Sequence, residues 1–301
     1  MTILQSILLG FLQGVAEFLP ISSSGHLQLA QSLLGLDEVP LLFDVFLHLA
    51  TLFAVCIYFW PRIWSLLKCF GRWIARRERP AESFDSTDLL CGTDEAGRKT
   101  IIAVIIATVI TGAIGVVTSK LIPDMPNKVI CGGFIVTSAL LITSALLEKR
   151  QNAKKAAETG AEAGAGVTTD AATGTDTPKG VSVKQSLLIG FMQGFGTLPG
   201  ISRSGSTIAG ALFSGVDRAA AGEFSFIVSI PAILGAFILE LKDLGDVSAT
   251  IGAGAVIAGC VTAAVTGYLS VLLLMKLIRK GKLQWFAAYL IPVGILGMIL
   301  L

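Results

Sequence analysis

QSILLGFLQGVAEFLPISSSGHL, residues 5–27, reappears in altered form as QSLLIGFMQGFGTLPGISRSGST, residues 185–207. The two stretches align without a gap at a constant offset of 180, and 11 of their 23 positions are identical. Each has an apolar start that is broken by proline and then by a cluster of serines. This internal repeat predicts a chain of two related halves, residues 1–150 and 185–301.

The composition indicates that a lipid bilayer is the solvent of this chain. Of its 301 residues, 53% are hydrophobic and 15% are charged, and the mean hydropathy is +0.76. Apolar runs long enough to cross about 30 Å of hydrocarbon recur along the sequence. They predict six transmembrane helices, near residues 43–60, 101–119, 129–147, 219–240, 249–275 and 284–301.

Two further apolar stretches, residues 1–36 and 185–216, are interrupted by Pro, Gly and Ser, and each predicts a re-entrant helical hairpin. Segment 151–184, rich in Ala, Gly and Thr, predicts a flexible cytoplasmic linker. Because three spans separate the two hairpins, they are expected to enter the membrane from opposite sides. The expected fold is therefore an all-α membrane protein made of two inverted-topology repeats.

The basic residues predict the orientation of the chain. Segments 61–100, 149–184 and 276–283, together with Arg218, hold 19 of the 23 Lys and Arg residues. By the positive-inside rule these loops face the cytoplasm, which places both termini outside. The net charge of +2 gives no indication of nucleic-acid binding.

Polar residues gather around the two chain breaks. In the first copy, Gln13 and Glu17 share a helix face, and Pro20 then ends that helix. Serines after such a break cap a second half-helix, whose free N–H groups and positive dipole end favour an anion. In the second copy, Arg203 follows the break, and its guanidinium is suited to binding phosphate.

A charged side chain at membrane depth costs about 2.5–3.5 kcal/mol, so Arg203 requires an explanation. One alternative is a purely structural ion pair between Glu17 and Arg203 that joins the halves of a scaffold protein. Another is a transporter or flippase, because broken helices in inverted repeats are also a transporter architecture. His48, alone on an apolar span, is interpreted as a packed or helix-linking histidine.

The two motifs resemble those of a known family. QGVAEFLPISSSGH, residues 13–26, looks like the (E/Q)xxxE-FLP-SSSGH signature of the bacterial undecaprenyl-diphosphatases, the bacitracin-resistance phosphatases. PGISRSGST, residues 199–207, is similar to their PGxSRSxxT signature. The resemblance covers nearly the whole chain except residues 151–180.

The resemblance implies that the protein hydrolyses undecaprenyl diphosphate to undecaprenyl phosphate and inorganic phosphate. This reaction recycles the lipid carrier for peptidoglycan synthesis and confers bacitracin resistance. The resemblance also implies a multi-pass enzyme of the bacterial plasma membrane, with its site open to the outer face and Mg²⁺ or Ca²⁺ as cofactor. A homodimer is one expected assembly.

Position by position, the resemblance implies catalytic roles for Glu17, Ser23, His26 and Arg203. It places the metal at Glu17 and Gln13, although Gln13 offers an amide oxygen without a negative charge. The expected phosphate contacts are Ser22, Ser24, Ser202, Ser204 and Thr207.

Our mechanistic hypothesis makes Ser23 the nucleophile and His26 its base, with Glu17 orienting His26 or holding the cation. Ser22 and Ser24 remain alternative nucleophiles. A water molecule activated by Glu17 is the alternative attacking group.

Overall fold

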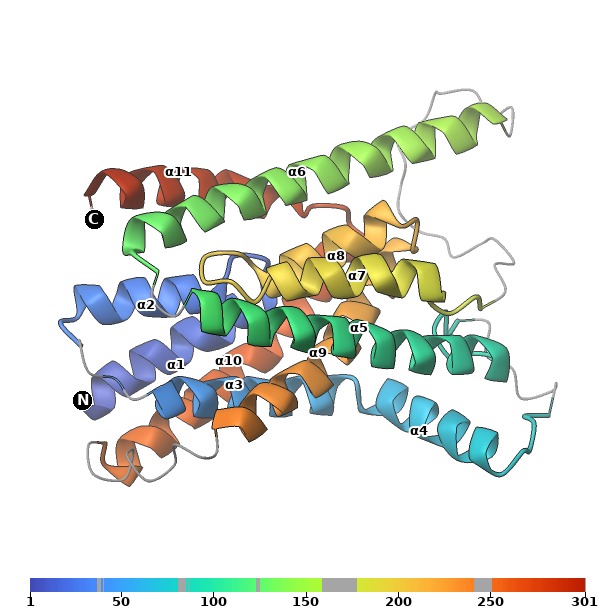
Figure 1. The fold of residues 1–301 in the computed structure, drawn as a ribbon, viewed down its shortest axis with the longest axis horizontal. Coiled ribbons are helices and arrows are strands. Elements are labelled where there is room, and N and C mark those ends of the chain that lie inside the picture. The colour runs from blue at the N-terminus through green and yellow to red at the C-terminus, as the bar shows by residue number, and fades with distance from the viewer. Residues whose placement is uncertain are drawn as a thin grey trace.

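The structure, a computed structural model, describes residues 1–36, 39, 41–80, 85, 87–122, 125–158, 178–240 and 251–300. Within these residues it contains eleven helices and no strand (Figure 1). In chain order they are α1 (Ile3–Phe18), α2 (Ser23–Leu33), α3 (Leu41–Tyr58), α4 (Trp60–Ile74), α5 (Asp94–Leu121), α6 (Asn127–Glu158), α7 (Val183–Phe195), α8 (Arg203–Phe213), α9 (Arg218–Glu240), α10 (Ala253–Arg279) and α11 (Gln284–Leu300).

The described helices confirm an all-α, multi-pass membrane protein. Helices α5, α6, α9 and α10 are long and apolar enough to cross a bilayer, and the bent pair α3 and α4 adds a fifth candidate. Helix α11 is apolar but shorter, at 17 residues. The predicted linker 151–184 begins inside α6, and its residues 159–177 lie outside the described part of the chain.

Helix α4 differs from the sequence-based expectation, which placed residues 61–100 in a basic loop. Pro61 stands in the first turn of α4, where its missing N–H costs nothing, and the axis bends by 76° between α3 and α4. The helix is amphipathic, with Leu66 and Cys69 buried while Trp60 and Trp64 are exposed. A short helix with one apolar face lacks the continuous apolar run that marks a span, so the sequence pattern did not predict it.

The sequence repeat reappears in the local structure. Helix α1 begins after a capping box of Thr2 and Gln5, and α7 begins after a capping box of Ser182 and Gln185, 180 residues later. Helices α2 and α8 cover residues 23–33 and 203–213, which are related by the same offset. In Figure 1 the pairs α1–α2 and α7–α8 enter from opposite ends of the long axis, and their turns meet in the middle.

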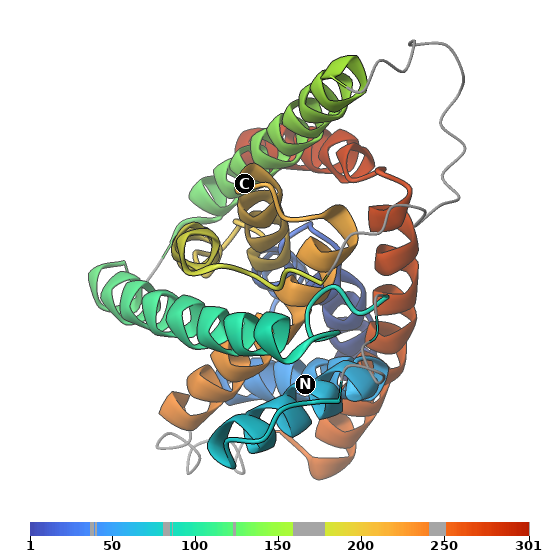
Figure 2. The same ribbon diagram turned by 90° about the vertical axis from the view of Figure 1, so that its right-hand side faces the viewer.

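Each hairpin packs against a long helix of the other half. Helix α1 lies along α10 and α7 lies along α5, while α6 and α11 pack together. Glycines permit these close approaches: a Cβ on Gly10 would lie 2.2 Å from the Gly259 carbonyl oxygen, and one on Gly190 would lie 2.7 Å from the Ala107 Cα. Seen along the long axis, α7 and α8 lie between α5, α6 and α10 (Figure 2). This packing holds both chain breaks inside the bundle.

Candidate active site

The two chain breaks touch each other in the interior of the bundle. A Cβ on Gly25, after the first break, would lie 3.1 Å from the Gly200 Cα in the second break. A Cβ on Gly205 would lie 3.1 Å from the Pro20 Cβ in the first break. The offset of 180 exchanges these two contacts, because Gly25 corresponds to Gly205 and Pro20 to Gly200. The start of α2 therefore faces the start of α8.

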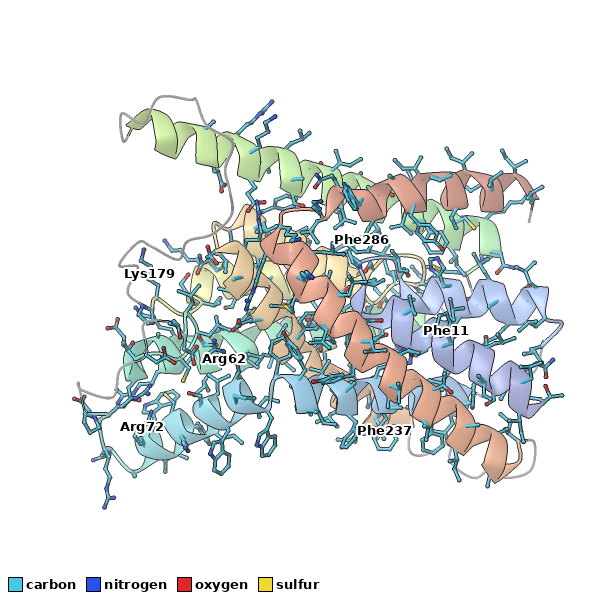
Figure 3. All side chains as sticks on the ribbon, turned by 180° about the vertical axis from the view of Figure 1, so that it is seen from behind. Phe11, Arg62, Arg72, Lys179, Phe237 and Phe286 are labelled. Atoms are coloured by element: carbon cyan, nitrogen blue, oxygen red, sulfur yellow. The ribbon has the colours of Figure 1, made fainter. Side chains whose placement is uncertain are left out.

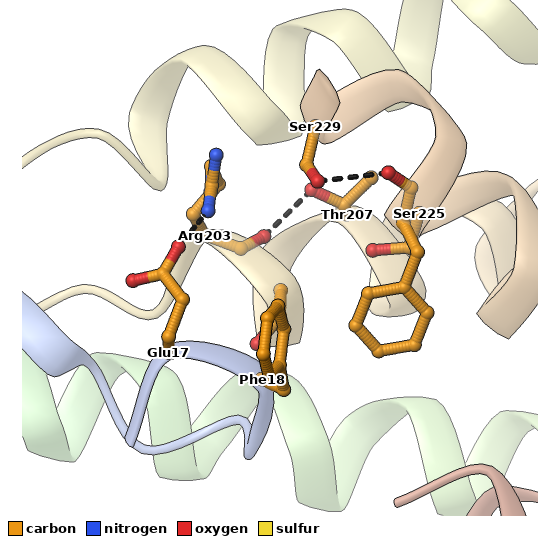
Figure 4. Close-up of a pocket in the computed structure, with 8 residues that line it drawn as sticks. Glu17, Phe18, Arg203, Thr207, Ser225 and Ser229 are labelled. Carbon is orange, nitrogen blue, oxygen red and sulfur yellow. Dashed lines mark hydrogen bonds and ion pairs between the residues drawn. The ribbon is translucent and has the colours of Figure 1, made fainter. Parts of the chain in front are cut away.

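Charges of opposite sign meet where the breaks touch. Arg203 Nη2, from the first residue of α8, contacts Glu17 Oε1 at the end of α1 (Figure 4). The other carboxylate oxygen of Glu17 accepts hydrogen bonds from Ser23 Oγ at 2.6 Å and from Gln13 Nε2 at 3.0 Å. The Glu17 side chain is 2% exposed. The structure thus brings together four of the residues that the sequence placed at the site.

A small cavity adjoins the ion pair (Figure 4). Its volume is about 10 Å³, room for roughly one water molecule. It is lined by Glu17, Phe18, Arg203, Ser204, Thr207, Ser225, Phe226 and Ser229. The serines Ser225 and Ser229, four residues apart on α9, were not among the predicted site residues, although their spacing on an apolar helix is a recognisable signal.

The hydroxyl groups of the second break are largely engaged. Ser202 caps α8 by accepting a hydrogen bond from the Gly205 N–H at 3.1 Å, and its hydroxyl lies 3.2 Å from that of Ser204. Thr207 donates to the Arg203 carbonyl oxygen at 2.6 Å (Figure 4). Of these hydroxyl residues, Ser204 and Thr207 line the cavity, while Ser202 supports the backbone behind it.

His26 does not lie where our mechanistic hypothesis requires it. Its Nδ1 is 2.8 Å from the Ser22 carbonyl oxygen and its Nε2 is 2.9 Å from the Tyr289 hydroxyl. Because a carbonyl only accepts, Nδ1 carries the proton, and Nε2 of the neutral ring accepts from Tyr289. Both nitrogens therefore have partners other than Ser23, whose hydroxyl donates to Glu17 instead. The hydrogen bonds favour Glu17 over His26 as the base, and sequence reasoning had not identified Tyr289.

Ser22 is strained at the first break. Its backbone has φ 70° and ψ 91°, a conformation that side chains other than glycine rarely adopt. Its hydroxyl is buried and has no hydrogen-bond partner among the described residues, and the same holds for Ser206 in the second copy. Ser24 is half-buried. Strain and an unpaired hydroxyl beside Ser23 are typical of a site arranged for a ligand.

His48 is a second histidine at the site. Its Nδ1 lies 2.7 Å from the Asp44 carbonyl oxygen, and its Nε2 lies 3.4 Å from Glu17 Oε2. The contact links α3 to α1, in agreement with a helix-linking role, and it also places His48 against the carboxylate of the site. An isolated ionisable residue in an apolar span is a functional candidate by default, and that signal could have placed His48 at the site, although the sequence was interpreted as giving it a structural role.

The residues around Glu17 can be tested against the divalent cation that the resemblance implies. The described residues contain no group of three or more His, Cys, Asp or Glu side chains placed to hold a metal ion. However, Gln13 Oε1 is buried and has no hydrogen-bond partner in the described part of the chain. Rotating this amide would turn Oε1 toward Glu17. Mg²⁺ commonly uses one or two protein oxygens together with water and substrate phosphates, so this pair of residues fits such an ion.

Comparisons with known proteins agree with the two motifs. The family model of the bacitracin resistance protein BacA matches residues 6–296. An undecaprenyl-diphosphatase of Treponema denticola is 42% identical over 295 residues, covering 98% of this chain and 96% of that protein. Proteins of the same name are 37% identical over 300 residues in Methanosphaera stadtmanae, covering 99% and 98% of the two chains, and 38% identical over 293 residues in Desulfatibacillum aliphaticivorans, covering 97% and 96%. The chain belongs to the BacA family of bacitracin resistance proteins.

Proposed function

We propose that this protein is a membrane phosphatase that hydrolyses undecaprenyl diphosphate to undecaprenyl phosphate and inorganic phosphate. Family membership supports the reaction, since relatives that match nearly the whole chain carry the name undecaprenyl-diphosphatase. The observation that carries the proposal is the hydrogen bond from Ser23 to Glu17 beside the Arg203 guanidinium. This arrangement joins a nucleophile, a proton acceptor and a phosphate-binding cation at one point.

In the proposed reaction, Arg203 binds the terminal phosphate and orients it toward Ser23. Ser23 Oγ attacks the terminal phosphorus, its proton passes to Glu17, and the bridging P–O bond breaks to release undecaprenyl phosphate. Water then hydrolyses the phosphoserine and releases inorganic phosphate. Substrate phosphate competes with Glu17 for Arg203, which would free a carboxylate oxygen for the proton.

The surrounding residues take supporting roles in this proposal. Glu17 and Gln13 would hold a Mg²⁺ or Ca²⁺ ion, which when bound would neutralise charge on the transferring phosphoryl group. Ser204 and Thr207 would contact phosphate from the cavity wall, and Ser202 would fix the start of α8. Ser22 and Ser24 stand beside the nucleophile as further hydrogen-bond donors to phosphate. His26 would position the first break rather than act as the base.

The proposal includes a topology of six spans and two re-entrant hairpins in two inverted repeats, residues 1–150 and 185–301. The exchange of contacts at the two breaks under the offset of 180 supports the inversion. Both termini lie at one end of the long axis in Figure 1, so they would share the outer side of the plasma membrane, onto which the site would open. A cysteine added at the C-terminus and labelled only from the cytoplasmic side would contradict this orientation.

The main rival is a transporter or flippase for a phosphate-bearing lipid, because the broken-helix architecture suits transport equally. The Ser23–Glu17 hydrogen bond favours an enzyme, since transport needs no nucleophile. The deciding experiment measures phosphate release from the C55 diphosphate by purified protein, with and without EDTA, for wild type, Glu17→Ala, Ser23→Ala and Arg203→Ala. We expect the wild type to release phosphate and each of the three substitutions to abolish that release. Absence of release under every condition would favour transport.

If Ser23→Ala keeps near-wild-type turnover while Arg203→Ala loses it, water activated by Glu17 replaces Ser23 as the attacking group.

A dimer is the proposed assembly, and its mass in detergent can be measured in the same preparations.

A further inference from the structure

A second cavity lies between the α3–α4 bend and the last turns of α10. Its volume is about 310 Å³, against about 10 Å³ for the cavity at the ion pair. Ligand pockets in proteins measure about 300–1,000 Å³, so this cavity is large enough for a small polar group. Its lining residues are Tyr58, Leu272, Met275, Lys276, Arg279 and Lys280. Three of the six are cations and none is acidic.

The cations of this α10 cavity are uncommitted. Lys276, Arg279 and Lys280 are exposed, and none makes a hydrogen bond or ion pair with a described residue. Their neighbours differ, since Arg62 forms two ion pairs and Arg218 forms one. Figure 3, the view from behind, shows α10 crossing in front of the bundle and labels Arg62 on α4. Three unpaired cations around one hollow form a binding surface for an anion.

The carboxylates that bind Arg62 do not neutralise this surface. Asp88 and Glu223 both bind Arg62, at 2.8 Å and 3.2 Å respectively. Glu223 also acts electrostatically on Arg279, but no ion pair joins the two side chains. Arg279 therefore keeps its guanidinium donors available to a ligand.

Capping of α10 does not explain the three cations either. The helix ends in a Schellman motif around Gly281, which has φ +64°. The Gly281 N–H donates to the Ile278 carbonyl oxygen at 2.9 Å, and the Lys282 N–H donates to that of Leu277 at 3.1 Å. Because backbone groups satisfy these carbonyls, the basic side chains are not needed as caps.

The position of the cavity is that of a lipid headgroup. Trp60 and Trp64, just past the bend, are 56% and 47% exposed, and tryptophans gather at the level where hydrocarbon meets water. Ile57, next to Tyr58 on α3, and Leu272 and Leu273 on α10 are exposed apolar side chains, and Tyr58 and Leu272 line the cavity itself. Acyl chains can lie on this apolar surface while a headgroup reaches the cations.

We propose that the α10 cavity binds the phosphate of an anionic phospholipid. A phosphodiester supplies the negative charge that three cations favour, and the adjoining apolar surface selects a lipid over a free ion. Glu17 and Arg203 line the other cavity, and Ser23 is hydrogen-bonded to Glu17, so this binding site does not depend on the proposed reaction.

The test compares phosphatidylglycerol with phosphatidylcholine of identical acyl chains, added to the purified full-length protein in neutral detergent. Lipid binding is read by native mass spectrometry and by the rise in Tm. Wild type should prefer phosphatidylglycerol. The triple variant Lys276→Gln, Arg279→Gln, Lys280→Gln should lose at least about tenfold of that preference, since each basic residue near an anionic headgroup contributes measurably.

A matched triple variant, Lys68→Gln, Arg76→Gln, Arg77→Gln, removes the same charge from exposed positions outside the cavity and should change the preference by less than about threefold. The charge-preserving double variant Lys276→Arg, Lys280→Arg should retain the preference for phosphatidylglycerol. This control separates a loss of lipid binding from a loss of folding. Equal losses in both triple variants would mean general surface attraction and overturn the proposal. If inorganic phosphate stabilised the wild type as much as phosphatidylglycerol does, and the Lys276, Arg279, Lys280 triple variant lost that stabilisation, the site would bind a free anion. That result would also overturn the proposal.

Discussion

Replacing Glu17 by glutamine separates the two candidate bases of the reaction. Glutamine has nearly the same shape and can still accept the hydrogen bond that Ser23 donates to Glu17 at 2.6 Å. It cannot accept a proton, however, and it carries no charge to pair with Arg203. The substitution therefore removes the chemistry of the carboxylate while largely preserving its volume.

The size of the effect follows from the role of the removed group. A general base contributes about 10²–10⁴ to the rate, so kcat should fall by that factor, equivalent to about 2.7–5.4 kcal/mol. KM should stay within a few-fold of wild type, because Arg203 is then free to bind phosphate without competition. Phosphate release by the purified protein across pH 6–9 measures both parameters. Monodispersity on size exclusion checks that the variant is folded.

His26→Gln is the matched control for Glu17→Gln. The histidine contacts Ser22 and Tyr289 at 2.8 Å and 2.9 Å, so its loss should weaken two hydrogen bonds and lower kcat by about tenfold or less. The pH profile should keep its shape. If His26→Gln instead lost 10²-fold or more and Glu17→Gln stayed within about tenfold, the assignment of the base to Glu17 would be refuted.

Three further predictions concern separate parts of the molecule. Gly200→Ala should lower Tm and activity, because the added Cβ would lie 2.1 Å from the Ile130 carbonyl oxygen. Gly35 also has a positive φ, but a Cβ there meets no atom within 4 Å, so Gly35→Ala should lower the free energy of unfolding by only about 1–2 kcal/mol. Equal losses of stability in the two variants would contradict this reasoning. Burial raises the pKa of the Cys91 thiol to about 12, so iodoacetamide should label it slowly at pH 8 and about tenfold faster for each pH unit up to that value, whereas rapid labelling of the native protein at pH 7 would be inconsistent with a buried thiol. Gln13→Glu should lower the Mg²⁺ or Ca²⁺ concentration needed to restore activity after EDTA, and an unchanged requirement would remove Gln13 from the metal site.

The chain breaks were predictable because proline and serine leave local signals. A serine-capped half-helix was expected after the first break; α2 does begin at Ser23, but Ser22 makes no capping hydrogen bond with its side chain, whereas Ser202 caps α8 in the second copy. The all-helical membrane fold followed from apolar runs in the same way. The bend after Tyr58 was not predictable, since Pro61 in the first turn of a helix does not by itself indicate a change of direction.

The hydrogen-bond partners within the site were much harder to predict. Spacing along a helix suggested that His26 faces Ser23, but the ring turns toward Tyr289, 263 residues away in the sequence. His48 likewise reaches Glu17 from a different helix. Such contacts depend on how helices pack, and periodicity within one segment gives no information about that packing. The sequence therefore identified the residues of the site better than their roles.

The two hairpins share a frame and differ in chemistry. Under the offset of 180, Ser23 corresponds to Arg203 and Glu17 to Thr197, so one hairpin provides the carboxylate and the proposed nucleophile while the other provides the cation. Inside a membrane, either charge alone would be costly to bury, and their contact offsets much of that cost. In the proposed reaction the same contact would loosen when a phosphate binds the guanidinium, which would leave the carboxylate beside Ser23 without its counter-ion. The ion pair that makes this site tolerable at membrane depth is thus also the interaction through which phosphate binding would prepare the base.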